Sequence, residues 1–151
     1  MYRLFQEARR KAEDHPLEAL ELCEQALQIA QAHGYHPGLA WYLRESGSCY
    51  ESLVQYDEAL SRLGRACEMF EALGIPAGLA SATHVIGIIE SERGNFPRAL
   101  ECFERYVELA RELGRRESFA IGLGNIAETY FGAGGALAGL AAAAPESARA
   151  A

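Results

Sequence analysis

The stretches HPLEAL at residues 15–20, QYDEAL at 55–60 and FPRAL at 96–100 end on the same alanine–leucine pair, once every 40 residues. Two further sets of small residues keep this spacing without an insertion: Gly34, Gly74 and Gly114, and Ala40, Ala80 and Ala120. A fixed period of this size is typical of stacked supersecondary units, each too small to bury its own apolar face. It predicts an elongated scaffold stabilised by contacts between neighbouring units, and it favours function on a surface over function in a catalytic pocket.

The spacing of apolar residues within each unit predicts helices. Leu60, Leu63 and Cys67 recur every three or four positions, which indicates one apolar stripe along a helix. The repeated glycines are expected to end helices in a left-handed conformation. Pro16 and Pro97 suit the first turn of a helix. Asp14, Asp57 and Asn95 are expected to be helix caps. The helices are predicted at residues 2–13, 16–32, 38–53, 57–73, 77–93, 97–113 and 117–131.

The predicted fold is therefore an all-α solenoid of about three and a half antiparallel helix pairs. Its units span about residues 1–36, 37–76, 77–116 and 117–135, which together make a repeat array over residues 1–135. The remaining residues, 136–151, are rich in Ala and Gly. Because Ala is the best helix former, we expect a short helix at 136–144 that covers the last repeat, followed by disorder after Pro145. A disordered end throughout is the alternative.

Composition and charge argue against two classes of binding partner, nucleic acids and membranes. The chain has a formal net charge of −7 and no dense basic run, and nucleic-acid binding needs Lys and Arg to displace phosphate counterions. No apolar run approaches the roughly 18 residues of a membrane span, and the first 20 residues are too charged for a signal peptide. The four cysteines show no CxxC pairing, which favours reduced thiols in a cytoplasmic protein. We therefore expect neither nucleic acid nor a membrane as partner.

The small residues inside each unit resemble the code of the tetratricopeptide repeat family. The family's pattern of small, aromatic, small, large apolar and small residues is carried by Gly47, Tyr50, Ala59, Leu63 and Ala66. In the next unit the same positions are Gly87, Glu90, Ala99, Phe103 and Tyr106, of which Glu90 and Tyr106 depart from the pattern. Small residues are needed where two paired helices cross, because only Gly or Ala allows the close approach. The 40-residue period exceeds the family's usual period of about 34, and resembles the arrays of bacterial signalling proteins.

The resemblance implies a non-catalytic scaffold that binds a protein or peptide segment in a concave groove. The alternative is the N-terminal sensory or dimerisation region of a larger bacterial signalling protein, such as a diguanylate cyclase, a histidine kinase or a transcription regulator. In the family the first helix of each pair lines the groove. The positions carried over to this sequence are Tyr2, Phe5 and Arg9, then Trp41, Arg44 and Ser48, then Ser81, His84 and Ile88, and at the far end Ile121 and Glu128.

Two of these groove residues have a second interpretation: Trp41 and Phe5 could simply pack between units. Against it, Trp, Tyr and Arg on one face are the types that dominate binding energy in interfaces. His84 is expected to make binding sensitive to pH near its ordinary pKa of about 6.5. The family's clamp for a C-terminal carboxylate needs Lys and Asn at fixed positions. Here the matching positions hold Arg44 and Ser48, then Val85, then Ile121 and Asn125. Binding of chaperone tails is therefore not expected.

The remaining motifs give little support for a cofactor site, a metal site or a catalytic nucleophile. GLGNIA at residues 122–127 matches a dinucleotide fingerprint, but that loop needs a preceding strand, and this segment is predicted to be helical. His33 and His36 lack a third ligand for zinc, and Ser46 and Ser48 lie on a helix rather than on a strained elbow. We expect no cofactor, no metal and no enzyme activity. The last repeat has little to cover Leu123, Ile126 and Tyr130, so a weak homodimer through an open solenoid end is expected.

Overall fold

The computed structural model describes residues 2–143, with side chains over residues 3–137, and within that range it contains seven α-helices and no strand. The helices are α1 Tyr2–Lys11, α2 Pro16–Ala32, α3 His36–Ser52, α4 Tyr56–Leu73, α5 Pro76–Glu92, α6 Phe96–Glu112 and α7 Arg116–Ala143. The all-α solenoid is thus confirmed. The bounds of α2 to α6 lie within two residues of the predicted ones. None of the helices in the described residues is long and apolar enough to cross a membrane.

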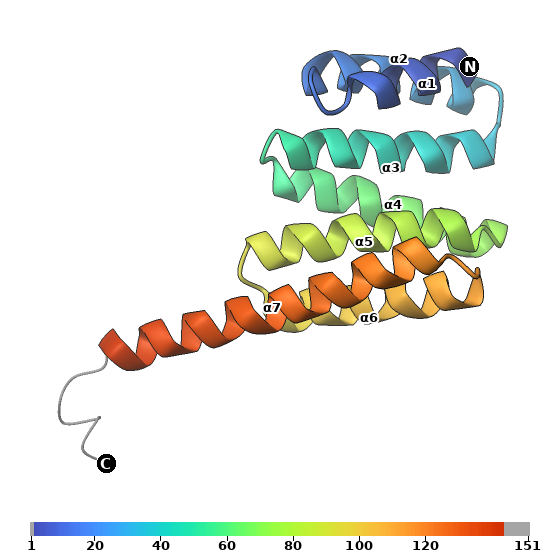
Figure 1. Ribbon diagram of the computed structural model, residues 1–151. Helices are drawn as coiled ribbons and strands as arrows, with labels where there is room; N and C mark the ends of the chain where they lie inside the picture. Colours follow the sequence, from blue (N-terminus) through green and yellow to red (C-terminus); the bar gives the residue numbers. More distant parts are fainter. Residues whose placement is uncertain (1, 144–151) are drawn as a thin grey trace.

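The helices stack as antiparallel pairs, each packed on its neighbours along the chain (Figure 1). We call α1, α3, α5 and α7 the first helices and α2, α4 and α6 the second helices. Direct contacts join α1 to α3 and α3 to α5, whereas contact between consecutive second helices is marginal at most. The first helices therefore lie on the inner side of the stack. Their solvent-facing surface is called the first-helix face below.

Small residues allow the helices of a pair to approach closely, as the period predicted. A Cβ atom at Gly47 would lie 2.6 Å from Leu63, and one at Gly87 would lie 2.7 Å from Phe103. Real Cβ atoms almost never approach that closely, so only glycine fits at these crossings. Ala59 and Ala99 on the second helices are fully buried. The small residues that recur in the sequence therefore lie where α3 crosses α4 and where α5 crosses α6.

Glycine ends four helices in the left-handed conformation. Gly34, Gly74, Gly94 and Gly114 have φ between +63° and +75°. At the first of these turns, the amide N–H of Tyr35 donates to the carbonyl of Ala30 over 2.9 Å, which satisfies a carbonyl that the helix leaves free. The predicted C-terminal role of Gly34, Gly74 and Gly114 is confirmed. Gly94 plays the same part after α5.

Val54 occupies the position of Gly94 one unit earlier and has φ +59°. A β-branched residue is strained there, and the Val54 side chain is 67% exposed, so it contributes little packing. We expect Val54→Gly to raise the free energy of unfolding by about 1 kcal/mol, since relief of strain outweighs the extra chain entropy of glycine. Gly94→Val is the matched control and should lower it by about 1–3 kcal/mol. Urea denaturation measures both, and a destabilised Val54→Gly variant would contradict the strain.

The predicted caps are largely wrong. Asp14 precedes the N-cap residue His15, and Asp57 lies inside the first turn of α4, whose N-cap residue is Gln55. Asn95 is the N-cap residue of α6, but its side-chain amide donates to Glu90 Oε2 over 2.8 Å instead of capping the helix. Proline in the first turn begins α2, α3, α5 and α6, as predicted for Pro16 and Pro97. In these four helices the fixed φ of proline therefore takes the place of side-chain capping. Helix α4 begins with neither.

Helix α7 also differs from the prediction, because it does not end near residue 131. It continues through Gly132, Gly134 and Gly135 to Ala143, and it projects beyond the end of α6 (Figure 1). Residues 136–143 are helical as expected, but they continue α7 instead of forming a separate short helix. Each glycine costs a helix only about 1 kcal/mol, and the surrounding alanines favour continuation. Residues 144–151, including the expected disorder after Pro145, lie outside the described residues.

The four cysteines are free thiols, and Cys23, Cys49 and Cys102 are buried. Burial raises the pKa of Cys102 to about 11 and also raises the pKa of Cys67. A hydrogen bond to Cys49, together with burial, raises the pKa of Cys23. Protonated thiols of this kind are poor nucleophiles, so Cys23, Cys67 and Cys102 act as small packing residues. The same hydrogen bond lowers the pKa of Cys49.

Candidate functional site

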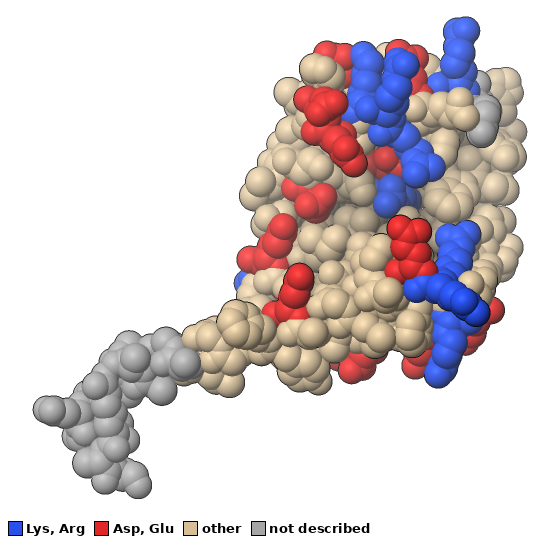
Figure 2. Space-filling model, viewed as in Figure 1, with Lys and Arg blue, Asp and Glu red and all other residues tan. Residues whose placement is uncertain are grey.

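The expected groove residues come from α1, α3, α5 and α7 and lie on the first-helix face. The face is unevenly charged. Figure 2 shows Lys and Arg over α1 and again where α7 begins, and acidic side chains along the opposite, left-hand edge. A chain with a net charge of −7 thus presents local basic regions on this side.

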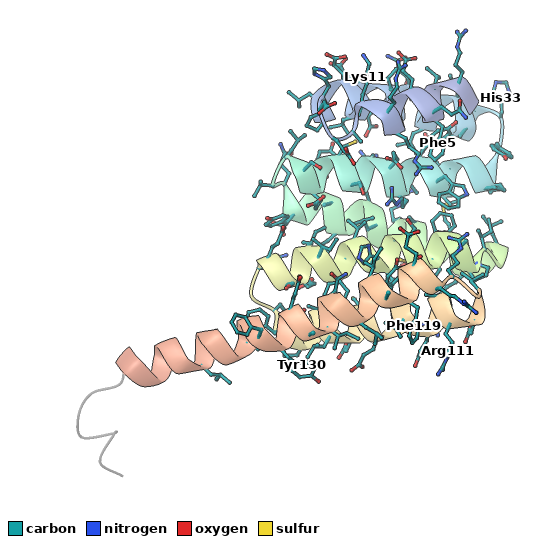
Figure 3. All side chains as sticks on the ribbon, in the orientation of Figure 1. Phe5, Lys11, His33, Arg111, Phe119 and Tyr130 are labelled. Atoms are coloured by element: carbon teal, nitrogen blue, oxygen red, sulfur yellow. The ribbon has the colours of Figure 1, made fainter. Side chains whose placement is uncertain are left out.

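The aromatic residues at the α1 end of the face pack mostly on one another. Phe5 lies between α1 and α3 (Figure 3). Its ring meets Trp41 edge-on with a centroid distance of 6.4 Å and Tyr42 at 5.7 Å. Trp41 in turn meets Phe70 of α4 at 4.8 Å. The packing interpretation of Phe5 and Trp41 therefore holds for much of both rings, although both side chains stay half-buried rather than fully buried.

The two groove arginines lie in different surroundings. Arg9 is exposed, and its guanidinium carbon lies 5.8 Å from the centre of the Phe5 ring. Arg44 is half-buried and pairs through Nη1 with Glu45 Oε2 over 2.8 Å. Glu45 is only 4% exposed, so the pair is removed from most of the water that would screen it. The Nε of Arg44 is buried and has no hydrogen-bond partner among the described residues. The packing of the helices thus leaves this N–H donor without an acceptor.

His84 is held by contacts to two other helices. Its ring stacks on Tyr106 of α6 with a centroid distance of 4.5 Å, and its Nε2 lies 2.8 Å from Nδ2 of Asn125 on α7. Burial lowers the pKa of His84, and the charge of Arg44 lowers it further. A neutral imidazole fits this contact, because the Asn125 amide then donates to Nε2 and the ring proton stays on Nδ1. The expectation of a pH response near the ordinary pKa of histidine is corrected to lower pH.

His84 should therefore link stability to pH. Its folded-state pKa lies below the unfolded value of about 6.5, so the unfolded chain binds more protons in that interval. The free energy of unfolding should fall as the pH drops from about 7.5 through 6.5 towards the folded-state pKa. His84→Gln should flatten this part of the profile. An NMR titration of the His84 ring with a midpoint at or above 6.5 would contradict the burial effect.

A hollow of about 170 Å³ opens beside His84, where α5, α6 and α7 meet. Its polar lining comes from Ser81 and His84 of α5, Tyr106 of α6, Arg115 in the turn before α7, and Ser118 in the first turn of α7. Ala77, Ala80 and Ala110 complete the wall. The sequence identified Ser81 and His84 as site residues but missed the other three. Tyr106 lies on a second helix and Arg115 and Ser118 lie near a turn, positions that the groove pattern does not include.

The remaining expected groove residues do not gather into one site. Ser48 and Ile88 are half-buried on α3 and α5, and Ile121 and Glu128 are exposed on α7. Tyr2 is the first residue of α1, and its side chain lies outside the part that the structure describes. The structure thus brings together an aromatic group around Trp41 and a polar group around His84. Arg44 lies on α3 between them.

The other motifs take structural roles. GLGNIA at 122–127 lies inside α7, and a Cβ atom at Gly122 would lie 2.5 Å from Val107 of α6, so this glycine serves helix packing. His33 and His36 are exposed beside the turn after α2. No group of three or more His, Cys, Asp or Glu residues that could hold a metal ion occurs in the described part of the chain.

Comparison with known proteins supports this fold. Residues 5–72 match the family model of the tetratricopeptide repeat. Among solved structures, the chain is similar to a Podosopora anserina chain assigned as a kinesin light chain with nearly identical TPR-like repeats. The TM-score is 0.75 at 20% sequence identity, over 88% of this chain and 66% of that chain. No curated protein sequence matches this chain. The family match over residues 5–72, the repeat code and the stacked helix pairs together show a fold of the tetratricopeptide repeat type.

Proposed function

We propose that the protein is a non-catalytic scaffold that binds a peptide segment of a partner protein along the first-helix face, mainly over α3 and α5. Tetratricopeptide repeats generally mediate interactions between proteins. The main evidence for the location of this binding site is the buried Nε of Arg44, which has no hydrogen-bond partner among the described residues. A buried donor without an acceptor costs about 1–3 kcal/mol, and a bound peptide carbonyl or carboxylate would remove that cost.

The shape of the face favours an extended or helical segment over a small molecule. The first helices lie side by side on the inner side of the stack and form a long surface rather than a closed pocket. Half-buried Ser48 and Ile88 flank Arg44 and His84 along it. The aromatic group around Trp41 keeps a partly exposed edge at one end of this surface, which suits an apolar side chain of the peptide.

The test begins with peptides selected from a random display library on the intact chain. Isothermal titration of a selected peptide should show binding to the parent that weakens roughly tenfold or more in Arg44→Gln. Arg65→Gln, an exposed arginine on α4, is the matched control and should bind like the parent. Because Arg44→Gln leaves Glu45 buried and unpaired, Ser48→Trp is a second variant that obstructs the face without breaking that pair. Parent-like affinity in both groove variants would refute the location.

The homodimer through the open end stays a prediction. Leu123, Tyr130 and Phe131 on α7 are 48%, 59% and 86% exposed, so the last described helix presents apolar side chains without a second helix to cover them. This supports weak self-association through α7. The alternative role within a larger signalling protein concerns sequence outside this chain and also stays a prediction.

A further inference from the structure

The hollow beside His84 occupies a position that is filled in the preceding unit. There, Trp41 of α3 packs on Phe70 of α4 at 4.8 Å, and a Cβ atom at Gly78 of α5 would lie 2.3 Å from the Phe70 ring. Trp41, Phe70 and Gly78 thus form a tight plug between the helices of successive units. Forty residues later the corresponding residues are Ser81, Ala110 and Ser118, and all three line the hollow.

A fourth replacement adds charge to the same place. Ile75, a half-buried apolar residue next to the plug, corresponds to Arg115 at the hollow. Two apolar side chains, Trp41 and Ile75, are thus matched by a hydroxyl and a guanidinium at the hollow, and Ser118 adds a second hydroxyl where the preceding unit has glycine. Loss of packing alone would leave a cavity lined by smaller apolar residues, whereas this cavity is polar.

The residues that line the hollow include hydrogen-bond donors but no carboxylate side chain. Neither Asp nor Glu is among its eight lining residues. Among the described residues, the hydroxyls of Ser81, Ser118 and Tyr106 and the guanidinium of Arg115 take part in no hydrogen bond or ion pair. Each of these hydroxyls can donate as well as accept, and the guanidinium can only donate, so around a hollow of about 170 Å³ all four groups can donate to one small group that carries acceptors only. A carboxylate is such a group, and a guanidinium can hold it with two parallel hydrogen bonds.

We propose that this hollow is a specificity subsite that takes the side-chain carboxylate of an aspartate or glutamate in the bound peptide. The inference rests on the proposed function and names the class of its ligand: an acidic segment that runs across α5 towards the start of α7. Arg115 holds the carboxylate, Ser81 and Ser118 donate hydrogen bonds to its oxygens, and the ring of Tyr106, stacked on His84, forms one wall. Trp41 and Phe70 close the equivalent place one unit earlier, so that unit contributes no such subsite.

The direct test uses N-acetyl-glutamate N′-methylamide as probe, followed by NMR. It should shift the resonances of Arg115, Ser118 and the His84 ring saturably, whereas the neutral glutamine analogue should not. Arg115→Gln should weaken the effect roughly tenfold or more, and Arg65→Gln should leave it unchanged. Equal shifts with the glutamine analogue, no shift in the tens of millimolar range, or shifts with methyl phosphate alone would overturn the carboxylate subsite.

A second variant restores the plug of the preceding unit. The triple change S81W/A110F/S118G fills the hollow with the residue types found at positions 41, 70 and 78. It should raise the melting temperature and abolish the response to the glutamate probe. A response like that of the parent would show that the probe binds elsewhere.

Failure of the subsite and failure of the proposed function give different results. Selected peptides that bind the parent and Arg115→Gln equally well, but bind Arg44→Gln weakly, would overturn the subsite and leave the groove intact. A parent chain that selects no peptide at all would count against the proposed function itself.

Discussion

Replacing Ala99 by arginine should lower the free energy of unfolding by more than about 4 kcal/mol, a large share of the 5–15 kcal/mol typical of a folded domain. Ala99 is fully buried on α6, at the position where Ala59 meets Gly47 one unit earlier. An arginine there would have to displace neighbouring side chains and bury its charge without a partner, and each effect is costly. Thermal unfolding followed by circular dichroism measures the loss.

The control for this substitution is Glu104→Arg on the same helix. Glu104 is exposed, so this change should stay within about 0.5 kcal/mol of the parent. Both variants place an arginine on α6, at a buried position in one case and at an exposed position in the other. If their melting curves coincided, the assignment of the repeated alanines to the helix crossings would be wrong.

Phe70→Ala should cost about 3–5 kcal/mol, the usual range for removing a buried aromatic ring. Phe70 is fully buried, contacts the Trp41 ring and fills the space beside Gly78. The variant would open in the second unit a hollow like the one that Ala110 leaves in the third. Leu73→Ala, three residues further along α4 at a site that is 38% exposed, should cost much less. Urea denaturation compares them, and similar losses would show that the Trp41–Phe70 plug does not hold successive units together.

The fold was predictable because close packing of paired helices restricts residue type. Gly47 and Gly87 face a large side chain at less than 3 Å from where a Cβ atom would lie, so the small residue must recur with every unit. Left-handed turns likewise require glycine at Gly34, Gly74 and Gly114. Caps such as Asn95 were not predictable in the same way, because proline in the first turn of α6 already favours helix initiation.

The end of the array was predicted less well than its middle. Glycines at 132, 134 and 135 suggested a break, yet α7 continues through them. A glycine imposes a turn only where the surrounding structure requires a positive φ, as at Gly94 between α5 and α6. No described second helix follows α7 to impose such a turn. Helix propensity of the alanines then determines the local structure.

The candidate site was only partly predictable, because it is formed across helices. The family pattern located Ser81 and His84 correctly on α5, but Tyr106 and Arg115 reach the same hollow from α6 and from the turn before α7. Trp41 looked like a binding anchor in the sequence and proves to be largely a packing residue, because Phe70 lies behind it. Comparison of successive units, Trp41 with Ser81 and Phe70 with Ala110, is the signal in the sequence that could have revealed the hollow.

Binding of a partner peptide across the first helices can be located with a spin-labelled peptide. A peptide selected on the intact chain would carry a nitroxide at one end, and its paramagnetic broadening would be recorded on the assigned NMR spectrum. Resonances from α3, α5 and the start of α7 should broaden, with little effect on the exposed sides of α2 and α4. Broadening concentrated on α2 or α4, with α3 and α5 unaffected, would contradict it.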